Sequence, residues 1–135
     1  MTSSLPQTAE AASQVVLVVE DEALIRMSLA IALEDSGFTV IEANGADAAL
    51  REFAQRQDIT IVITDVRMPG SMDGIGLCNW LRDHEPAVPF IICSGRETLT
   101  DLQGFHPSVF RVAAKPYSPD AIVDHVRQML GQPDV

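Results

Sequence analysis

The stretch from Ile59 to Asp65 constrains the fold more than any other part of the chain. Six consecutive β-branched residues, Ile-Thr-Ile-Val-Ile-Thr, lead directly into the carboxylate of Asp65. A run this short and this apolar is typical of a strand buried on both faces, in the middle of a parallel sheet. Pro69 and Gly70 follow closely and end the strand. Asp65 is therefore expected at the carboxyl end of a central strand, where open α/β sheets place their ligands, although an Asp here also commonly caps a turn or the next helix.

Four other apolar segments predict further strands, and segments with helical or turn signals separate them. The predicted strands are Val15–Val19, Phe38–Glu42, Pro89–Cys93 and Val109–Ala114. Strands that alternate with helices require a parallel sheet with right-handed crossovers. A chain of 135 residues has the length of one domain with about five β-α units. The sequence therefore predicts a single α/β domain.

Helical spacing and capping residues mark the helices between these strands. Leu24, Met27, Ser28 and Ile31 recur at helical spacing. Asn44 is placed to cap the next helix, because its side chain can accept a backbone hydrogen bond. Trp80 is expected in the core, on the helix that follows the central strand.

Polar and charged residues stand where four of the predicted strands end. They are Glu20 and Asp21, Asp65, Ser94, and Lys115. Each alone has a plainer explanation, as an acid near a helix N-terminus, a turn residue or a solvated surface charge. Because parallel strands present their carboxyl ends at one edge of the sheet, the four groups together indicate a shared site there.

The residue types at this edge indicate phosphoryl chemistry. Clustered carboxylates repel one another and need a cation, and oxygen ligands suit Mg²⁺, which also binds phosphate oxygens. A carboxylate in such a site can act as a nucleophile toward a phosphoryl group. A lysine ammonium and a serine hydroxyl can then donate to the transferred oxygens.

Five short motifs occur in order along the chain. They are Val18-Val19-Glu20-Asp21-Glu22, Thr64-Asp65-Val66-Arg67-Met68-Pro69, Met72-Asp73-Gly74, Ser94-Gly95 and Lys115-Pro116-Tyr117. With these motifs the chain resembles the receiver domains of two-component response regulators, over residues 14–131. The resemblance implies a flavodoxin-like (βα)5 fold with a central five-stranded parallel sheet in the order 2-1-3-4-5.

The resemblance also assigns roles at the carboxyl edge. Asp65 would be the phosphoacceptor. Four groups would bind Mg²⁺, namely Glu20, Asp21, Asp65 and the backbone carbonyl of Arg67. Ser94 and Lys115 would contact the phosphate, and the peptide bond before Pro116 would be cis, an isomer that X-Pro bonds tolerate.

Three features depart from the usual receiver pattern. Val112 stands three positions before Lys115, where receivers usually carry an aromatic switch residue. The loop Met68–Gly74 is one residue longer than the common form. The segment Arg96–His106 has few apolar anchors for a helix, which predicts low local stability. We therefore expect phosphorylation to order or shift Arg96–His106, rather than to move a ring on the fifth strand.

The expected function is that of a stand-alone response regulator. A sensor histidine kinase or a histidine phosphotransfer protein would phosphorylate Asp65. The chain would catalyse only its own phosphorylation and dephosphorylation, and would signal to an unidentified downstream protein as a monomer or weak dimer. A phosphorylation-independent pseudo-receiver adaptor is one alternative. A metal-dependent phosphatase or another phosphotransferase is a second, although Arg67 stands where a further acid would be needed.

Composition limits the partners and the compartment. The formal net charge of −10 disfavours non-specific binding to DNA or to anionic membranes. No apolar run approaches the ~20 residues that span a bilayer, and Met1–Ser13 has no apolar signal region, so a cytoplasmic location is expected.

Residues 1–13 are predicted to be a disordered tail and residues 132–135 a C-terminal tail. Cys78 and Cys93 lie in apolar segments and are expected to be reduced core residues.

Overall fold

The computed structural model of the chain describes residues 14–95, 105 and 107–131. The two predicted tails, and the segment Arg96–His106 apart from Phe105, lie outside the described residues. The hypothesis that phosphorylation reorganises Arg96–His106 therefore stays a prediction. In the described part of the chain, no helix is long and apolar enough to cross a membrane.

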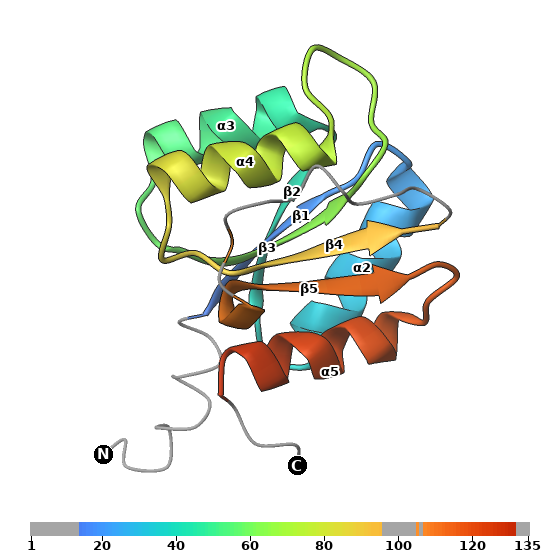
Figure 1. The fold of residues 1–135 in the computed structure, drawn as a ribbon. Helices are drawn as coiled ribbons and strands as arrows, with labels where there is room; N and C mark the ends of the chain where they lie inside the picture. Colours follow the sequence, from blue (N-terminus) through green and yellow to red (C-terminus); the bar gives the residue numbers. More distant parts are fainter. Residues whose placement is uncertain (1–13, 96–104, 106, 132–135) are drawn as a thin grey trace.

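The centre of the molecule is a sheet of five parallel strands (Figure 1). The strands are β1 (Val15–Val19), β2 (Thr39–Ala43), β3 (Ile59–Asp65), β4 (Phe90–Ser94) and β5 (Phe110–Ala114). Their spatial order is β2-β1-β3-β4-β5. The predicted flavodoxin-like α/β fold and strand order are confirmed, and the stretch that ends in Asp65 is the central strand.

Helices cover both faces of the sheet (Figure 1). The helices described are α2 (Ala23–Asp35), α3 (Ala46–Gln55), α4 (Gly74–His84) and α5 (Pro119–Met129), and a short 3-10 turn covers Pro107–Val109. Helices α3 and α4 pack on one face of the sheet, and α2 and α5 pack on the other. This arrangement buries the central strands on both faces, as their unbroken apolar sequence predicts.

Successive side chains of the strands alternate between the two halves of the core. In β1, Leu17 and Val19 face the α3 and α4 layer, whereas Val16 and Val18 face the α2 and α5 layer. Cys78 and Cys93 are buried and free, as expected for reduced core residues. Two small cores therefore sandwich the sheet and hold its carboxyl edge in place.

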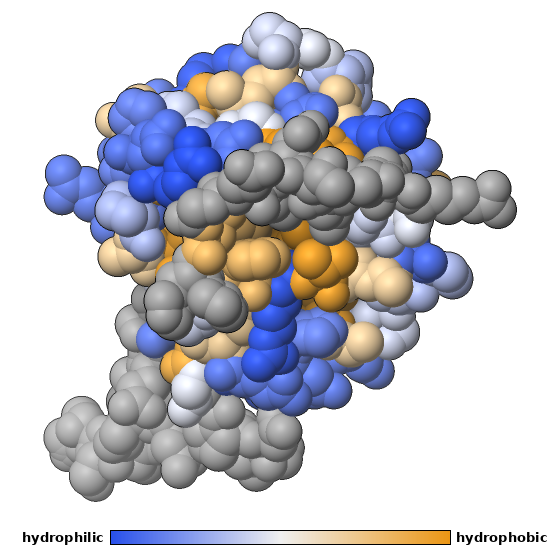
Figure 2. Space-filling model, viewed as in Figure 1, coloured by the Kyte–Doolittle hydropathy of each residue, from blue (hydrophilic) through white to orange (hydrophobic). Residues whose placement is uncertain are grey.

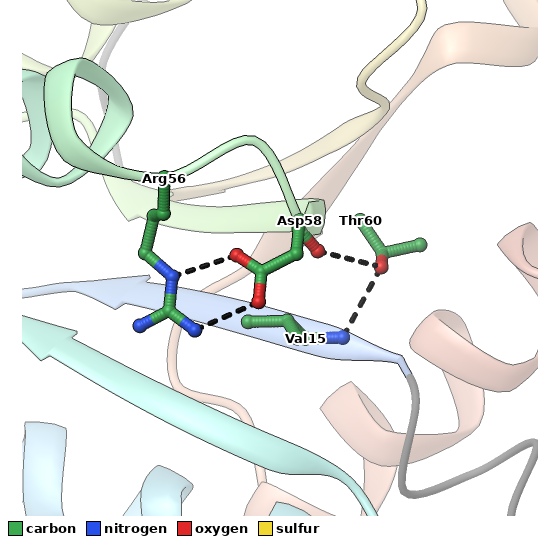
Figure 3. Close-up of polar contacts among 4 residues, drawn as sticks. All are labelled: Val15, Arg56, Asp58 and Thr60. Atoms are coloured by element: carbon green, nitrogen blue, oxygen red, sulfur yellow. Dashed lines mark hydrogen bonds and ion pairs between the residues drawn. The ribbon is translucent and has the colours of Figure 1, made fainter.

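The pairing of β1 with β3 has one irregularity, at the amino end of the sheet. Val15 pairs with Ile59 and Val16 pairs with Ile61, so Thr60 is skipped. The Thr60 hydroxyl accepts a hydrogen bond from the Val15 amide at 3.1 Å (Figure 3). Next to it, Arg56 and Asp58 form a two-pronged ion pair with distances of 2.7 and 2.8 Å. A side chain thus replaces the missing backbone partner where the ladder slips.

The helix that the spacing of Leu24, Met27 and Ile31 predicts is confirmed as α2. These three side chains are exposed, and Leu29 and Leu33 form the buried face of the helix. The predicted cap at Asn44 is wrong. The residue before α3 is Gly45 rather than Asn44, and α3 has no side-chain cap. Local spacing thus predicted the helix correctly, whereas neighbouring elements decide which of its residues are covered.

Trp80 is also placed differently from its predicted position in the core. Its ring is only partly buried and lies between Phe53, with a centroid distance of 5.4 Å, and His84, at 4.7 Å. The ring therefore covers the edge of the α3 and α4 layer rather than filling its interior.

Candidate functional site

Asp65 is the last residue of β3 and is only 8% exposed. Its Oδ1 accepts hydrogen bonds from the Val66 amide at 2.8 Å and from the Lys115 ammonium at 2.5 Å. Asp65 does not cap the next helix, because Asp73 does so by accepting a bond from the Gly76 amide at 2.9 Å. The explanation of Asp65 as the cap of the next helix is therefore wrong. Within the described part of the chain, both hydrogen bonds that its carboxylate accepts go to Oδ1, which leaves Oδ2 as the oxygen available for reaction.

Helix α4 begins directly against the backbone of Asp65. The Gly74 amide donates to the Val66 carbonyl at 2.8 Å. A Cβ atom on Gly74 would lie 1.8 Å from the Asp65 carbonyl oxygen. Only glycine fits this contact, so the first residue of α4 sets how closely the helix approaches the strand end that carries Asp65.

Three carboxylates meet at this edge of the sheet. Glu20, Asp21 and Asp65 each offer an oxygen, and these oxygens lie within 4.8 Å of one another. Glu20 is 4% exposed and its Oε2 accepts a hydrogen bond from the Glu22 amide at 2.9 Å, whereas Asp21 is exposed. A set of hard oxygen donors with one side open to solvent fits Mg²⁺, which keeps several waters and uses few protein carboxylates.

The negative charges of these carboxylates repel one another, which affects the pKa of Glu20. Burial raises the pKa of the Glu20 carboxyl from 4.5 to about 7, and hydrogen bonding and negative charge from Asp21 and the charge of Asp65 add to this rise. The hydrogen bond from the Glu22 amide opposes it. A cation beside these oxygens would remove the repulsion, so proton and cation compete for the same site.

Mg²⁺ affinity should therefore increase as pH rises. A group with a raised pKa keeps its proton up to that pKa, so Glu20 must lose a proton to bind a cation below pH 7. One such proton makes Mg²⁺ binding about 10-fold weaker at pH 6 than at pH 8. Calorimetric titrations at both pH values measure this ratio. Glu20→Gln should flatten the dependence, and an unchanged pH ratio in that variant would contradict the assignment to Glu20.

Lys115 provides the positive charge of the site. Burial alone would lower the pKa of its ammonium, but the hydrogen bond to Asp65 and the charges of Asp65 and Glu20 outweigh burial and raise that pKa above its ordinary value. Lys115 is therefore protonated at neutral pH and pairs with the carboxylate at the end of β3. The peptide bond between Lys115 and Pro116 is cis.

The remaining predicted residues lie around this centre. Ser94 ends β4 and is buried, and its carbonyl accepts a hydrogen bond from the Lys115 amide at 2.8 Å. Arg67 follows Asp65 by two positions with an exposed side chain. The role of its carbonyl as a metal ligand stays a prediction, as does the role of Ser94 as a phosphate contact.

Val112 lies on the outermost strand β5, and its side chain is 46% exposed. Apolar side chains gather between the α4 and α5 layers on this side of the molecule, with hydrophilic side chains above and below (Figure 2). The position that is usually aromatic in receivers thus carries a short side chain that faces solvent.

The acidic residues, Ser94 and Lys115 thus lie together at the carboxyl edge of the sheet. Residues 16–127 match the family described as the response regulator receiver domain. The chain belongs to the response regulator receiver domain family. Receiver domains of known structure share its fold. The receiver domain of NtrX from Brucella abortus is 27% identical with a TM-score of 0.74, and the comparison covers 87% of this chain and 99% of that one. A receiver domain protein from Clostridium thermocellum has a TM-score of 0.77 at 24% identity, over 87% of this chain and 94% of that one, which supports the fold.

Several relatives at the sequence level are named as transcriptional regulatory proteins. The transcriptional regulatory protein ResD of Bacillus subtilis is 33% identical over 116 residues, which cover 85% of this chain and 47% of ResD. CseB of Streptomyces coelicolor is 36% identical over 117 residues, covering 85% of this chain and 48% of CseB. The receiver spans about half the length of these relatives.

Two residues at the site were not singled out by the sequence. Gly74 drew attention only as part of a motif, since its collision with Asp65 depends on how closely α4 approaches β3. Arg26, which donates a hydrogen bond to the Glu20 carbonyl at 2.8 Å, belongs to no motif. Its one local signal is an arginine in the first turn of a helix, where a cation is unfavourable.

Proposed function

We propose that this receiver accepts a phosphoryl group on Asp65 with the help of Mg²⁺ and then signals by binding another protein. The observation that carries the proposal is the meeting of three carboxylates and one ammonium at the end of the central strand. Capping, turn formation and surface solvation do not explain this arrangement. The alternative of a pseudo-receiver does not account for the ion pair between Lys115 and the buried carboxylate of Asp65.

The proposed reaction transfers a phosphoryl group between two side chains. Asp65 Oδ2 attacks the phosphorus of a phosphohistidine on the donor protein. The new bond joins oxygen to phosphorus, and the bond from phosphorus to the histidine nitrogen breaks. The electron pair of that bond returns to the imidazole, which leaves as a neutral ring because its other nitrogen already carries a proton.

The surrounding residues stabilise charge during this transfer. Mg²⁺, when bound, neutralises negative charge on the carboxylates and on the phosphoryl oxygens. The ammonium of Lys115 and the amide of Val66 hold Oδ1, which leaves Oδ2 for the incoming donor. Lys115 is also placed to donate to a phosphoryl oxygen on the modified side chain. The chain would act only on its own aspartate, in phosphorylation and in dephosphorylation.

A phosphotransfer profile tests the proposal. Purified histidine kinases and histidine phosphotransfer proteins, each carrying labelled phosphate, are mixed briefly with the receiver in Mg²⁺. One donor should transfer much faster than the others, and phosphorylation should change which proteins the receiver captures in a pull-down. The proposal of a stand-alone regulator predicts that the isolated chain captures its target without any attached domain. Absence of transfer from every donor, with binding of the same partners in both states, would favour the adaptor.

The exposed face of α2 provides a surface for the donor. Leu24 is 83% exposed, Ile31 is 56% exposed and Met27 is 48% exposed. A groove of about 840 Å³ runs from Leu24 and Ile25 to Tyr117, and Glu20 and Lys115 also line it. The groove is therefore continuous with the site, so a protein seated there can bring its phosphohistidine to Asp65. Exposed apolar patches of this kind commonly mark interaction surfaces.

Leu24→Asp should slow transfer from the fastest protein donor by about 10-fold or more, because a buried apolar contact at an interface is replaced by a charge. Phosphorylation by acetyl phosphate should be unchanged, since a small donor needs no docking surface. Ala87→Asp is the matched control, with the same added charge on an exposed loop after α4. Equal slowing by both variants, or slowing with acetyl phosphate as well, would contradict this docking surface.

A further inference from the structure

Arg26 lies in the first turn of α2, just beyond the acid pair Glu20 and Asp21. Its side chain is only 18% exposed, which is low for an arginine near a helix end. Neither the motifs nor the roles discussed above involve Arg26. Helix α2 has no acid in its first turn and no side-chain cap, and a cation near a helix N-terminus is unfavourable. Arg26 therefore does not stabilise the start of α2, and its contacts with other elements account for its position.

The guanidinium of Arg26 connects three elements. Its Nη1 donates a hydrogen bond to the backbone carbonyl of Glu20 at 2.8 Å. Its Nε donates to Glu42 Oε1 at 3.1 Å. Glu42 belongs to β2 and is paired in register with Val18 of β1. The side chain thus joins the start of α2 to β2 and to the segment that follows β1.

The peptide groups of Glu20 are held on both sides. Its amide donates to the Ala43 carbonyl at 3.0 Å, which continues the pairing of β1 with β2. Strand β1 ends at Val19, so the Glu20 carbonyl lies beyond the ladder and has Arg26 as its partner. A carbonyl in this partly buried place needs such a partner. The next peptide carries Asp21, so the orientation of the Glu20 carbonyl also sets where Asp21 points.

We infer that Arg26 is a positioning residue for the acid pair. It holds the Glu20 backbone so that the carboxylates of Glu20 and Asp21 face Asp65 despite their mutual repulsion. It touches neither the cation nor the phosphoryl group. The inference rests on the proposed function, because it concerns the same Mg²⁺ site. It adds a residue outside the acidic cluster on which Mg²⁺ affinity depends.

Lysine cannot replace this arginine. The guanidinium is a rigid fork that reaches the Glu20 carbonyl and Glu42 together, whereas an ammonium is a single point on a flexible stem. Arg26→Lys keeps the positive charge and a residue that favours helix. Any effect of this variant therefore reports the loss of the guanidinium hydrogen bonds rather than a change in charge or folding. We expect it to weaken Mg²⁺ binding about 10-fold, the effect of losing one hydrogen bond to a charged donor.

Calorimetric titration of Mg²⁺ into the full chain tests this expectation. Arg26→Lys should raise the dissociation constant by that factor, and Glu42→Ala should raise it by a smaller amount because the tether to β2 is lost. Arg51→Lys is the matched control, since Arg51 is exposed on α3. The phosphorylation rate of Arg26→Lys by acetyl phosphate should return to within about 3-fold of wild type at saturating Mg²⁺, which a merely destabilised protein would not show.

A second measurement needs no metal. The Glu22 amide donates to Glu20 Oε2, so its hydrogen exchange in Mg²⁺-free protein reports the position of the Glu20 carboxylate. Arg26→Lys should speed that exchange, and Arg51→Lys should not. The inference is wrong if Arg26→Lys binds Mg²⁺ as tightly as the wild type does and protects the Glu22 amide equally well. The proposed function would still stand in that case. If the wild type itself does not bind Mg²⁺, the proposed function fails first.

Discussion

Replacement of Asp65 by Asn should abolish phosphorylation of the receiver by acetyl phosphate in Mg²⁺. An amide is a poor nucleophile and carries no charge to attract a cation, so both roles of the carboxylate are lost. We expect incorporation to fall by at least about 100-fold, the scale of removing a covalent nucleophile. Asn has nearly the same shape and can still accept the Val66 amide bond. The fold should therefore survive, and the loss will report chemistry.

Mass spectrometry of the intact protein measures this outcome directly. The wild type should gain one phosphoryl group and Asp65→Asn none. Asp47→Asn is the matched control, because Asp47 is an exposed acid in the first turn of α3. Undiminished incorporation into Asp65→Asn would show that the phosphoacceptor lies elsewhere. Incorporation into neither the wild type nor the control would favour the pseudo-receiver.

Gly74→Ala should destabilise the receiver by about 3 kcal/mol or more and impair phosphorylation as well. The added Cβ would stand 1.8 Å from the Asp65 carbonyl oxygen and 2.8 Å from its carbon. These are backbone atoms of the central strand, so neither side can yield without moving α4 or Asp65. Overpacking of a rigid contact costs about 1–3 kcal/mol, and occasionally more. Displacement of Asp65 would also lengthen its contacts with Lys115 and the acid pair.

Gly76→Ala is the matched control for this change. Gly76 lies two positions further along α4, and a Cβ there would meet the side chain of Met72 at 2.7 Å, which can move aside. Alanine also favours a helix over glycine by about 1 kcal/mol, so Gly76→Ala should remain within that amount of wild type. Urea denaturation of both variants measures the difference. Equal stability of Gly74→Ala and wild type, with normal phosphorylation, would show that α4 does not constrain Asp65.

Local sequence patterns were sufficient for the framework of this fold. The β-branched run before Asp65 and the apolar run before Glu20 predicted central strands, because burial on both faces of a sheet demands unbroken apolar sequence. The motifs at the strand ends then predicted which side chains share the carboxyl edge. Such predictions succeed because parallel strands all end on the same side, whatever the details of packing.

The spacing of apolar residues predicted helices but did not identify their buried faces. The spacing of Leu24, Met27 and Ile31 correctly indicated a helix, but the buried side of α2 is formed by Leu29 and Leu33. Helix α2 carries apolar residues on more than one face, so periodicity alone cannot choose among them. Packing against the sheet and α5 makes that choice. The apolar residues left outside become a candidate surface for the phosphodonor.

The sequence by itself determined the family, the strand order that the family implies, and the identity of the residues at the carboxyl edge. Those properties depend on residue type and on position along the chain. The tertiary structure decided how these groups act on one another. Asp65 and Lys115 are 50 positions apart and meet at 2.5 Å, Gly74 leaves no room above Asp65, and Arg26 holds the carbonyl of Glu20. Contacts and pKa shifts depend on distances of a few ångströms between segments far apart in sequence, and only the packing of helices on the sheet sets those distances.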